Sequence, residues 1–288
     1  MSYQIDFCKH GRFLTNLNDT YVGRSMREFG EWSEAEIILF SSLVGSGDHV
    51  LEAGSNIGAH TVWLSKQVGK AGKVLSFEPA IYTHQLLCAN LALNECFNVF
   101  THRKAVGESS GTVAFPIVDP LTGNNFGATS ILAADGFPTE RIDVVCIDDL
   151  ELQQLDFIKA DIEGYEFFLL KGARKTIARF MPTIYLEISP LAGSDCGTRD
   201  QLVNELNQYG YKCYYYITPL FNVNNAKGVK SDLFKSQASI DMVAINPLCY
   251  EVLNMAQATV GDTNLVFNGA GVSYRSPLWS DAVIKKRE

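Results

Sequence analysis

Short apolar runs alternate with longer amphipathic stretches along most of this chain, and this alternation constrains the fold more than any other feature. Such runs between turn residues are typical of buried strands, and the longer stretches have the spacing of helices. Parallel strands need a crossover, usually a helix, so the pattern predicts an α/β fold with a mostly parallel sheet. We expect strands at 49–53, 73–77, 98–101, 156–160, 183–188, 212–217 and 240–245, and helices opening at 33 and spanning 59–68, 83–93, 165–178 and 199–209.

The segments on either side of the alternation are expected to be appendages of one domain. Residues 1–32 are expected to form an N-terminal lead-in, and residues 33–255 the α/β domain. Residues 256–288 are rich in glycine and weakly periodic. This C-terminal tail is expected to wrap the domain, to contribute to a lid or to a homodimer contact, or to be partly disordered.

Three local patterns predict how particular segments fold. Ser33 and Glu36 have the spacing of a capping box, with the hydroxyl accepting from the first turn and the carboxylate reaching back. Residues 107–117 are expected to form a hairpin or to extend the edge of the sheet. Residues 119–136 are rich in Gly, Asn, Asp, Thr and Pro, which predicts a loop.

Charge and composition limit the kinds of partner. The formal net charge is −8 at pH 7, whereas broad nucleic-acid binding needs a clustered basic surface, so we expect no nucleic-acid partner. No apolar run reaches the ~18 residues of a membrane span, and the first residues lack the blocks of a signal peptide. The seven cysteines are scattered without a CxxC pair, which is typical of free thiols in a reducing compartment, so we expect the cytoplasm.

A glycine turn follows the strand at 49–53 and leads into a helix. Gly54 and Gly58 let the backbone turn sharply and let a ligand approach closely, with Asn56 between them. The spacing differs from the Gly-x-Gly-x-x-Gly pattern of dinucleotide sites. Glu52 at the strand end suits a cationic amino-acid tail such as that of S-adenosylmethionine. His60, just inside the helix, is a candidate for the wall of the same pocket.

Two further strand ends carry acidic residues. Glu78 ends the second strand about twenty residues after the turn, where a carboxylate can accept from both ribose hydroxyls, and Pro79 fixes the backbone that follows. Asp161 lies at the carboxyl end of a central strand, where ligands bind in open α/β sheets. Glu163 lies in the same turn. Acidic residues at or just after the ends of three predicted strands therefore predict a cofactor site.

These motifs together resemble the FkbM-type methyltransferases, a branch of the class I S-adenosylmethionine-dependent enzymes. The most specific block is Asp-x-Glu-Gly-x-Glu, and the resemblance covers roughly Gly30 to Ile188. The family more often has Asp and Val where this chain has Glu52 and Ala53. The matching blocks are Leu51-Glu52-Ala53-Gly54-Ser55-Asn56-Ile57-Gly58, Phe77-Glu78-Pro79, Ile147-Asp148-Asp149-Leu150 and Phe157-Ile158-Lys159-Ala160-Asp161-Ile162-Glu163-Gly164-Tyr165-Glu166.

The resemblance implies a Rossmann-like fold with seven strands, of which the last is antiparallel. It implies that 33–255 is a class I methyltransferase domain, that S-adenosylmethionine is the methyl donor, and that the reaction is O-methylation, often of a sugar hydroxyl. We therefore expect a transferase whose partner is a small hydroxylated acceptor, such as a sugar or a glycoconjugate.

Carboxylates near the strand ends are the candidates for chemistry. Methyl transfer is an in-line displacement, so much of the catalysis is positioning, and a hydroxyl acceptor also benefits from a base. Asp161 is our first candidate for this base, followed by Glu163 and Glu187. These three side chains also offer hard oxygen ligands, which leaves a divalent metal as an alternative, but no ligand spacing demands one and we assign no metal ligand. The loop at 121–130 is a candidate acceptor-side flap.

Other functions fit the motifs less well. A nicotinamide dehydrogenase would need the other glycine spacing, and a nucleic-acid amino-methyltransferase would need an Asp/Asn-Pro-Pro-aromatic motif where this chain has Asp161 to Gly164. N-methylation or carboxyl methylation of a small molecule or protein, and a non-catalytic cofactor-binding domain, stay open as alternatives.

Overall fold

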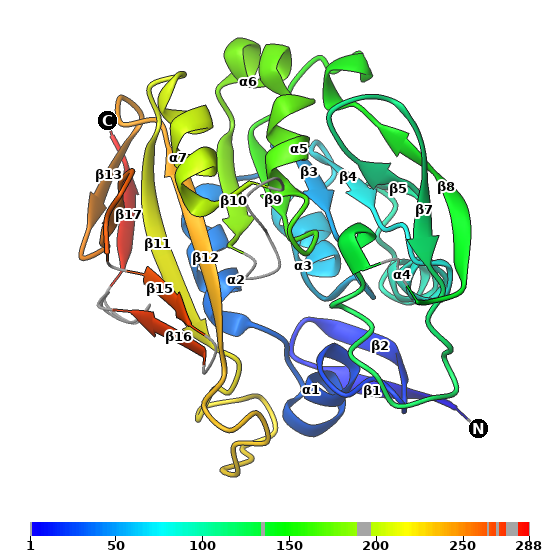
Figure 1. Ribbon diagram of the computed structural model, residues 1–288. Helices are drawn as coiled ribbons and strands as arrows, with labels where there is room; N and C mark the ends of the chain where they lie inside the picture. The colour runs from blue at the N-terminus through cyan, green and yellow to red at the C-terminus, as the bar shows by residue number, and fades with distance from the viewer. Residues whose placement is uncertain are drawn as a thin grey trace.

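A sheet of eight strands forms the centre of the molecule (Figure 1). The computed structural model describes residues 2–133, 136–188, 197–263, 265–268, 271–274 and 282–287. Neighbouring strands from β10 to β5 run parallel, whereas β12 runs antiparallel to both β10 and β11. The strands in sheet order are β14 (Gln257–Ala258), β11 (Lys212–Pro219), β12 (Ala238–Ile245), β10 (Thr183–Glu187), β9 (Phe157–Ala160), β3 (His49–Ala53), β4 (Lys73–Phe77) and β5 (Val99–His102).

This topology confirms the predicted fold class. The seven expected strands form a mostly parallel sheet, and the last of them in the chain, β12, is antiparallel. The eighth strand, β14, has two residues and comes from the predicted tail; it pairs with β11 at the sheet edge.

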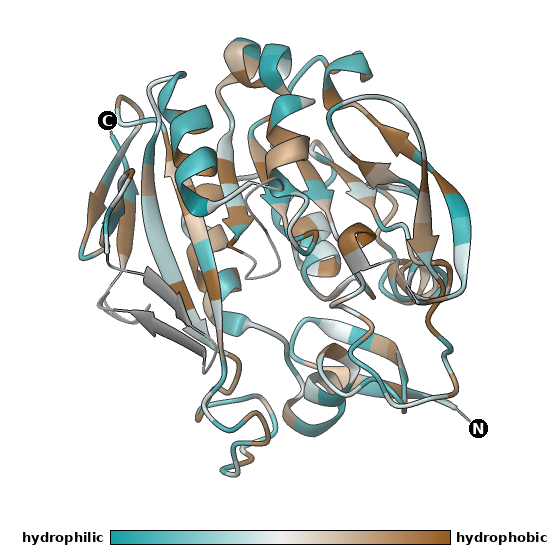
Figure 2. Cartoon of the chain, viewed as in Figure 1, coloured by the Kyte–Doolittle hydropathy of each residue, from teal (hydrophilic) through white to brown (hydrophobic). Residues whose placement is uncertain are grey.

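Helices cover both faces of the sheet because consecutive strand residues point to opposite sides. Val50 and Phe157 pack under α2 and α3, whereas Leu51 and Ile158 face α5, α6 and α7. Hydrophobic residues concentrate in the central strands, and the outer helix α7 is mostly hydrophilic (Figure 2). The helices are α2 (Glu34–Leu43), α3 (Ala59–Val68), α4 (Ile81–Leu93), α5 (Glu166–Lys171), α6 (Arg174–Phe180) and α7 (Arg199–Asn207).

The helix predicted at 165–178 is two helices, α5 and α6. In a continuous helix the Thr176 N–H would donate to the Gly172 carbonyl. Instead Thr176 N–H donates to the Asp148 carboxylate at 2.8 Å, and the Gly172 carbonyl accepts from the Asp148 N–H at 2.8 Å. Asp148 therefore takes the place of one helical hydrogen bond and breaks the helix.

The prediction for 107–117 was also wrong. Its strand β7 (Gly111–Pro116) pairs antiparallel with the distant β8 (Thr139–Val145), and β6 (Ala105–Val106) pairs parallel with β8. These strands form a separate three-stranded sheet beside β5, so 107–117 is neither a hairpin nor an extension of the main sheet.

The capping box predicted at Ser33 and Glu36 does not form. Ser33 has a φ of +43°, and its hydroxyl donates to the Glu36 carboxylate, whereas no side chain caps the backbone of the first turn. The Glu36 side chain is turned into the protein, where burial raises its pKa to about 7. Glu36 therefore bonds to the side chain of the N-cap residue and not to its backbone N–H, as a capping box would require.

The N-terminal lead-in lies against the carboxyl edge of the sheet (Figure 1). Its hairpin, β1 (Tyr3–Cys8) and β2 (Gly11–Asn16), is followed by α1 (Val22–Phe29). Two side-chain amides, one on α4 and one at its C-cap, hold the hairpin. Asn94 at the C-cap accepts from the Arg12 N–H at 3.0 Å, and Asn90 on α4 accepts from the Leu14 N–H at 2.6 Å.

The C-terminal tail adds strands to the edge of the main sheet and to two small separate sheets. Beyond β14 it contains a hairpin of β15 (Leu265–Asn268) and β16 (Gly271–Tyr274), and β17 (Val283–Lys286) pairs with β13 (Tyr250–Leu253). The remaining tail residues, and with them part of the prediction of a lid, dimer contact or disorder, lie outside the described residues. Within the described part of the chain, no helix has the length and apolar character to cross a bilayer.

Candidate active site

Gly54 makes possible the sharp turn that follows β3. Its φ is +79°, which glycine adopts without steric cost. A Cβ atom here would lie 1.8 Å from the Asp161 carbonyl oxygen, so any side chain would overlap this backbone. The Gly54 and Ser55 N–H groups donate to the Phe77 carbonyl at 2.9 and 3.1 Å, which ties the turn to the end of β4. Gly58, with a φ of +88°, precedes α3.

Glu78 directly follows β4, and its buried carboxylate accepts from two backbone N–H groups. Oε2 accepts from Asn56 and Oε1 from Ala80, both at 2.9 Å. Burial raises the pKa of Glu78 to about 7, although the two N–H groups oppose the shift. Each oxygen keeps a second lone pair, so Glu78 can also accept from the hydroxyls of a ligand.

Lys159 on β9 is a buried cation among carboxylates. Its side chain is 2% exposed, and its Nζ lies 3.2 Å from Oδ2 of Asp161. Glu52 is its register partner on β3 and accepts from the Thr61 hydroxyl at 2.5 Å. Burial alone would lower the pKa of Lys159, but Asp161, Glu52 and Glu36 together raise it above its usual value. Lys159 is therefore charged at neutral pH.

His60 and Glu52 each present a buried polar atom without a hydrogen-bond partner among the described residues. These atoms are Nε2 of His60 and Oε1 of Glu52. The nearest carboxylate to the His60 Nε2 is Glu36, at 3.8 Å, which is beyond hydrogen-bond distance. Burial and the charge of Lys159 hold the pKa of His60 well below its usual value, so the ring is neutral. Burial raises the pKa of Glu52 to about 7.

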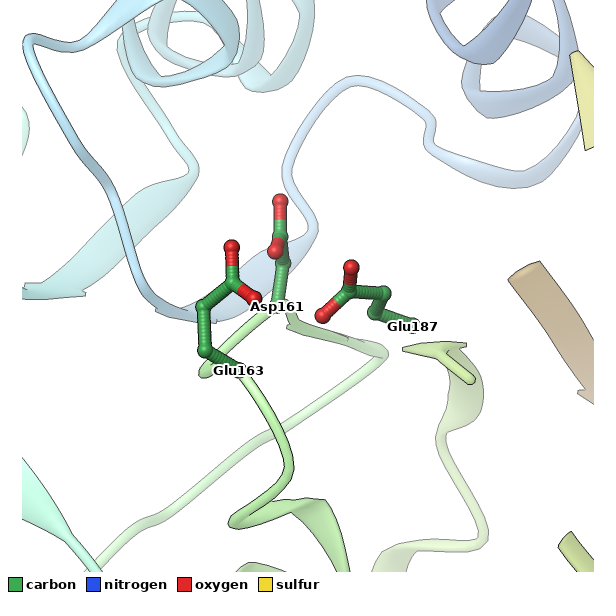
Figure 3. A group of neighbouring side chains, drawn as sticks. All are labelled: Asp161, Glu163 and Glu187. Atoms are coloured by element: carbon green, nitrogen blue, oxygen red, sulfur yellow. The ribbon is translucent and has the colours of Figure 1, made fainter. Parts of the chain in front are cut away.

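Asp161, Glu163 and Glu187 bring three carboxyl groups together at the ends of β9 and β10 (Figure 3). One oxygen from each lies within 4.8 Å of the others. Burial, Asp161 and Glu166 raise the pKa of Glu163 to about 8. Burial and then the charges of Glu163 and Asp161 raise the pKa of Glu187 well above its usual value.

Two adjoining pockets open at this carboxyl edge, and they share Gly54, Glu78, Gly127, Asp161 and Glu163. The first pocket, which we call the aromatic pocket, is walled by Phe77, Val106, Phe115 and Tyr165. The second, which we call the acidic pocket, has a volume of about 200 Å³. Its lining includes the buried Glu36, Glu52 and Lys159, together with Glu187. The partly exposed lining residues Tyr21, Trp32, Asn125, Leu220 and Ser239 are what we call its rim.

The fold gathers nearly all the residues that the sequence singles out, although their roles stay predictions. Pro79 lines the aromatic pocket, and Gly58 lines neither pocket but shapes the turn before α3. The candidate flap at 121–130 does reach both pockets through Gly127. The predicted residues that line the acidic pocket are Glu52, Gly54, Asn56, His60, Glu78, Asp161, Glu163 and Glu187.

Sequence reasoning did not place Lys159, Glu36, Tyr21 or Trp32 in the acidic pocket, although all four line it. Lys159 carried a signal, because a lysine inside a four-residue buried strand is rare unless it is paired. Glu36 was assigned to a helix cap instead. Trp32 lies in the segment that resembles the family but received no role there, and Tyr21 carried no signal. Both belong to the lead-in and reach the pocket only through its packing against the sheet edge.

Comparisons with known proteins agree with the motifs. The model of the family described as the Methyltransferase FkbM domain matches residues 52–213. Methyltransferase sdnD of Sordaria araneosa is 28% identical over 158 residues, which cover 44% of this chain and 61% of that protein. Methyltransferase 1 of Beauveria bassiana (strain ARSEF 2860) is 23% identical over 147 residues, which cover 43% and 57%. The chain thus spans about three-fifths of the length of these curated relatives.

The solved structure of Methyltransferase FkbM from Methylobacillus flagellatus KT is also similar. It is 21% identical, with a TM-score of 0.43, over 69% of this chain and 44% of that one. The family match covers more than half of the chain and contains Glu52, Glu78, Asp161 and Glu187. This chain belongs to the FkbM methyltransferase domain family.

Proposed function

We propose that the chain is an S-adenosylmethionine-dependent methyltransferase that methylates a hydroxyl group on a sugar or another small polyol or natural-product acceptor. The observation that carries this proposal is the acidic pocket, where the glycine turn and three strand-end carboxylates meet beside an aromatic pocket. Family membership supports the donor, because class I enzymes of this kind use S-adenosylmethionine.

The chain's residues fit this donor. The aromatic pocket suits a flat base, and Glu78 between the two pockets suits ribose hydroxyls. The unpartnered atoms of Glu52 and His60 suit the ammonium and carboxylate of an amino-acid tail. When bound, S-adenosylmethionine supplies a methyl group whose bond to sulfur breaks as the new bond to the acceptor oxygen forms, leaving a neutral thioether.

Asp161 is the proposed base. Its side chain is 41% exposed and lines both pockets, and its Oδ2 accepts from the Lys159 ammonium at 3.2 Å. It can therefore take the proton that the acceptor hydroxyl loses. Glu163 and Glu187 have raised pKa values, so at neutral pH they suit hydrogen bonds to neighbouring hydroxyls better than proton abstraction.

The rim of the acidic pocket supports a sugar or polyol as acceptor. Tyr21 and Trp32 offer aromatic surfaces, and Glu163 and Glu187, which line the same pocket, offer hydrogen-bonding groups. A sugar ring has an apolar face and a polar edge, and this pairing suits both. Carboxyl methylation is disfavoured because the carboxylates of the pocket would repel an anionic acceptor.

N-methylation is a second candidate, and the excess of carboxylates favours it. Six carboxylate side chains line the acidic pocket against one lysine (Glu36, Glu52, Glu78, Asp161, Glu163, Glu187 and Lys159). A cationic amine would be attracted there, but it would have to lose its proton before transfer. Parallel assays on hydroxylated and amine acceptors with the radiolabelled donor separate the two reactions.

The donor half is tested by calorimetric titration with S-adenosylmethionine, with NAD as the control ligand. We expect saturable one-to-one binding of the first alone, and Glu78→Ala should weaken it at least tenfold by removing the ribose contacts. Asp161→Asn should keep binding and lose at least a hundredfold in turnover. Full activity of Asp161→Asn on a hydroxyl acceptor would refute its assignment as the base.

Domain limits and location follow from the same proposal. Residues 33–255 are the proposed methyltransferase domain, with 1–32 as a lead-in over the acidic pocket, 256–288 as an appended tail, and a homodimer as a possible assembly. The cytoplasm is the proposed compartment, because the described cysteines are free thiols.

A further inference from the structure

We infer that Asp161, Glu163 and Glu187 form a binding site for one divalent cation. Figure 3 shows their carboxyl groups pointing toward one another from the ends of two adjacent parallel strands. Ca²⁺ and Mg²⁺ prefer such carboxylate oxygens at about 2.0–2.6 Å. Two oxygens on opposite sides of one ion therefore lie about 4–5 Å apart, and the observed limit of 4.8 Å agrees with this spacing.

An unpartnered oxygen of Glu187 points independently to a ligand. Its Oε2 is shut off from solvent and has no hydrogen-bond partner among the described residues. Buried carboxylate oxygens are nearly always paired, because an unpaired one loses its hydration without compensation. The missing partner is a hydrogen-bond donor or a cation, and the two further carboxyl groups of Asp161 and Glu163 within 4.8 Å favour a cation.

The cation that is already present in the pocket does not satisfy this oxygen. Lys159 is the one lysine or arginine among the described residues that line the acidic pocket, and its Nζ donates to Oδ2 of Asp161 at 3.2 Å. Three carboxyl groups within 4.8 Å of one another, beside a lysine that bonds to only one of them, leave room for a further positive charge.

The position of the cluster suggests what the cation does, and this step rests on the proposed function. Asp161 and Glu163 line both pockets, so an ion beside them would lie between the donor and acceptor sides. A divalent ion with open coordination positions could hold an acceptor by its oxygens and favour loss of the hydroxyl proton to solvent or to a carboxylate. Acceptors with two neighbouring oxygen atoms would then be preferred.

Binding of Mn²⁺ alone tests the site without donor or acceptor. The full chain is stripped with EDTA, dialysed and titrated with Mn²⁺ while free ion is followed by electron paramagnetic resonance. We expect one saturable site that Mg²⁺ or Ca²⁺ displaces. Glu187→Gln and Glu163→Gln should each weaken it at least tenfold, because each removes one charged ligand. No saturable Mn²⁺ binding by folded protein would overturn the inference.

Glu140→Gln is the matched control. Glu140 is a partly buried carboxylate on β8 that pairs with Arg103 and lines neither pocket. The variant should bind Mn²⁺ like the unaltered chain. Equal Mn²⁺ affinity in Glu187→Gln, Glu163→Gln and Glu140→Gln, with native circular dichroism, would place the ion elsewhere and overturn the inference. Methylammonium that displaces Mn²⁺ at equal concentration would also overturn it in favour of an organic cation.

The donor proposal is tested separately by S-adenosylmethionine titration of the same proteins. Donor binding without Mn²⁺ binding would reject the cation site and keep the proposed function. Mn²⁺ binding without donor binding would keep the cation site and reject the proposed function.

Discussion

Gly54 and Gly47 both have left-handed backbone conformations, with φ values of +79° and +89°, but their surroundings differ. A Cβ atom at Gly54 would lie 1.8 Å from the Asp161 carbonyl oxygen, whereas nothing lies within 4 Å of one at Gly47. We expect Gly47→Ala to lose only the roughly 1–2 kcal/mol of a left-handed alanine. Gly54→Ala should lose more and should also lose cofactor binding. Thermal unfolding and calorimetry compare the two, and equal losses would contradict the clash.

Lys159→Met tests the buried charge cluster. The side chains are similar in length, so the main change is the loss of a positive charge beside Asp161, Glu52 and Glu36. Leaving buried charges unpaired costs about 3–5 kcal/mol. The pKa values of Glu36 and Glu52 are raised to about 7, so both are ionised at about pH 8 and protonated at about pH 5.5.

The destabilisation by Lys159→Met should therefore be larger at about pH 8 than at about pH 5.5. Urea unfolding at the two pH values measures it. Lys171→Met is the control, because Lys171 pairs with the more exposed Glu108. A cost for Lys159→Met that does not change with pH would mean that the carboxylates do not depend on this lysine.

At the scale of elements, the lead-in and the connection between β11 and β12 are joined by aromatic rings. Phe234 stacks on Tyr21 with ring centroids 5.6 Å apart, and it also contacts Phe29 and Trp32 at 5.8 and 6.3 Å. The Tyr21 hydroxyl donates to the Gln237 side chain at 3.0 Å. Since Tyr21 and Trp32 line the acidic pocket, these contacts position its acceptor-side rim.

Phe234→Ala should loosen this rim. We expect a loss of roughly 3 kcal/mol in stability from the cavity, and a higher KM for the acceptor with little change in S-adenosylmethionine affinity. Steady-state kinetics with each substrate varied measure the two effects. Phe97→Ala is the control, because this side chain is 85% exposed; it should change neither the stability nor the KM for the acceptor. A loss of donor affinity equal to the loss for the acceptor would argue against a role confined to the rim.

For the molecule as a whole, the buried carboxylates make stability depend on pH. Burial raises the pKa of Glu36, Glu52, Glu78 and Glu166 to about 7, above the unfolded value of about 4.3. A raised carboxyl pKa means that the folded state binds more protons, so stability is full below about pH 4.3 and is lost as pH rises through about 7. Each group contributes up to about 1.4 kcal/mol per pH unit in that window.

The melting temperature without ligand should therefore fall between about pH 5.5 and 8. A cationic ligand in the acidic pocket favours the ionised carboxylates, so saturating S-adenosylmethionine should make this fall smaller. Differential scanning calorimetry across the range, with and without the donor, tests both statements. A melting temperature that rises toward pH 8 without ligand would show that these carboxyl groups are ionised at ordinary pKa values.

The order of strands and helices, the glycine turn and the acidic strand ends could all be predicted from the residues. They depend on local patterns: Val50 and Leu51 alternate between two apolar faces, and Gly54 is required by one tight turn. Parallel topology then places the ends of β3, β4, β9 and β10 at one edge of the sheet. The sequence alone therefore predicts that Glu52, Glu78 and Asp161 lie close together.

Long-range packing determined what these patterns did not contain. The break between α5 and α6 depends on Asp148, which lies more than twenty residues away, and β7 pairs with β8 across a long loop. Glu36, Tyr21 and Trp32 join the site only because the lead-in and α2 fold over the sheet edge. The distances among the carboxyl groups of Asp161, Glu163 and Glu187 likewise depend on the pairing of β9 with β10. Local spacing determines which backbone conformation and which face of a helix or strand each residue takes. Contacts between distant segments determine which residues meet.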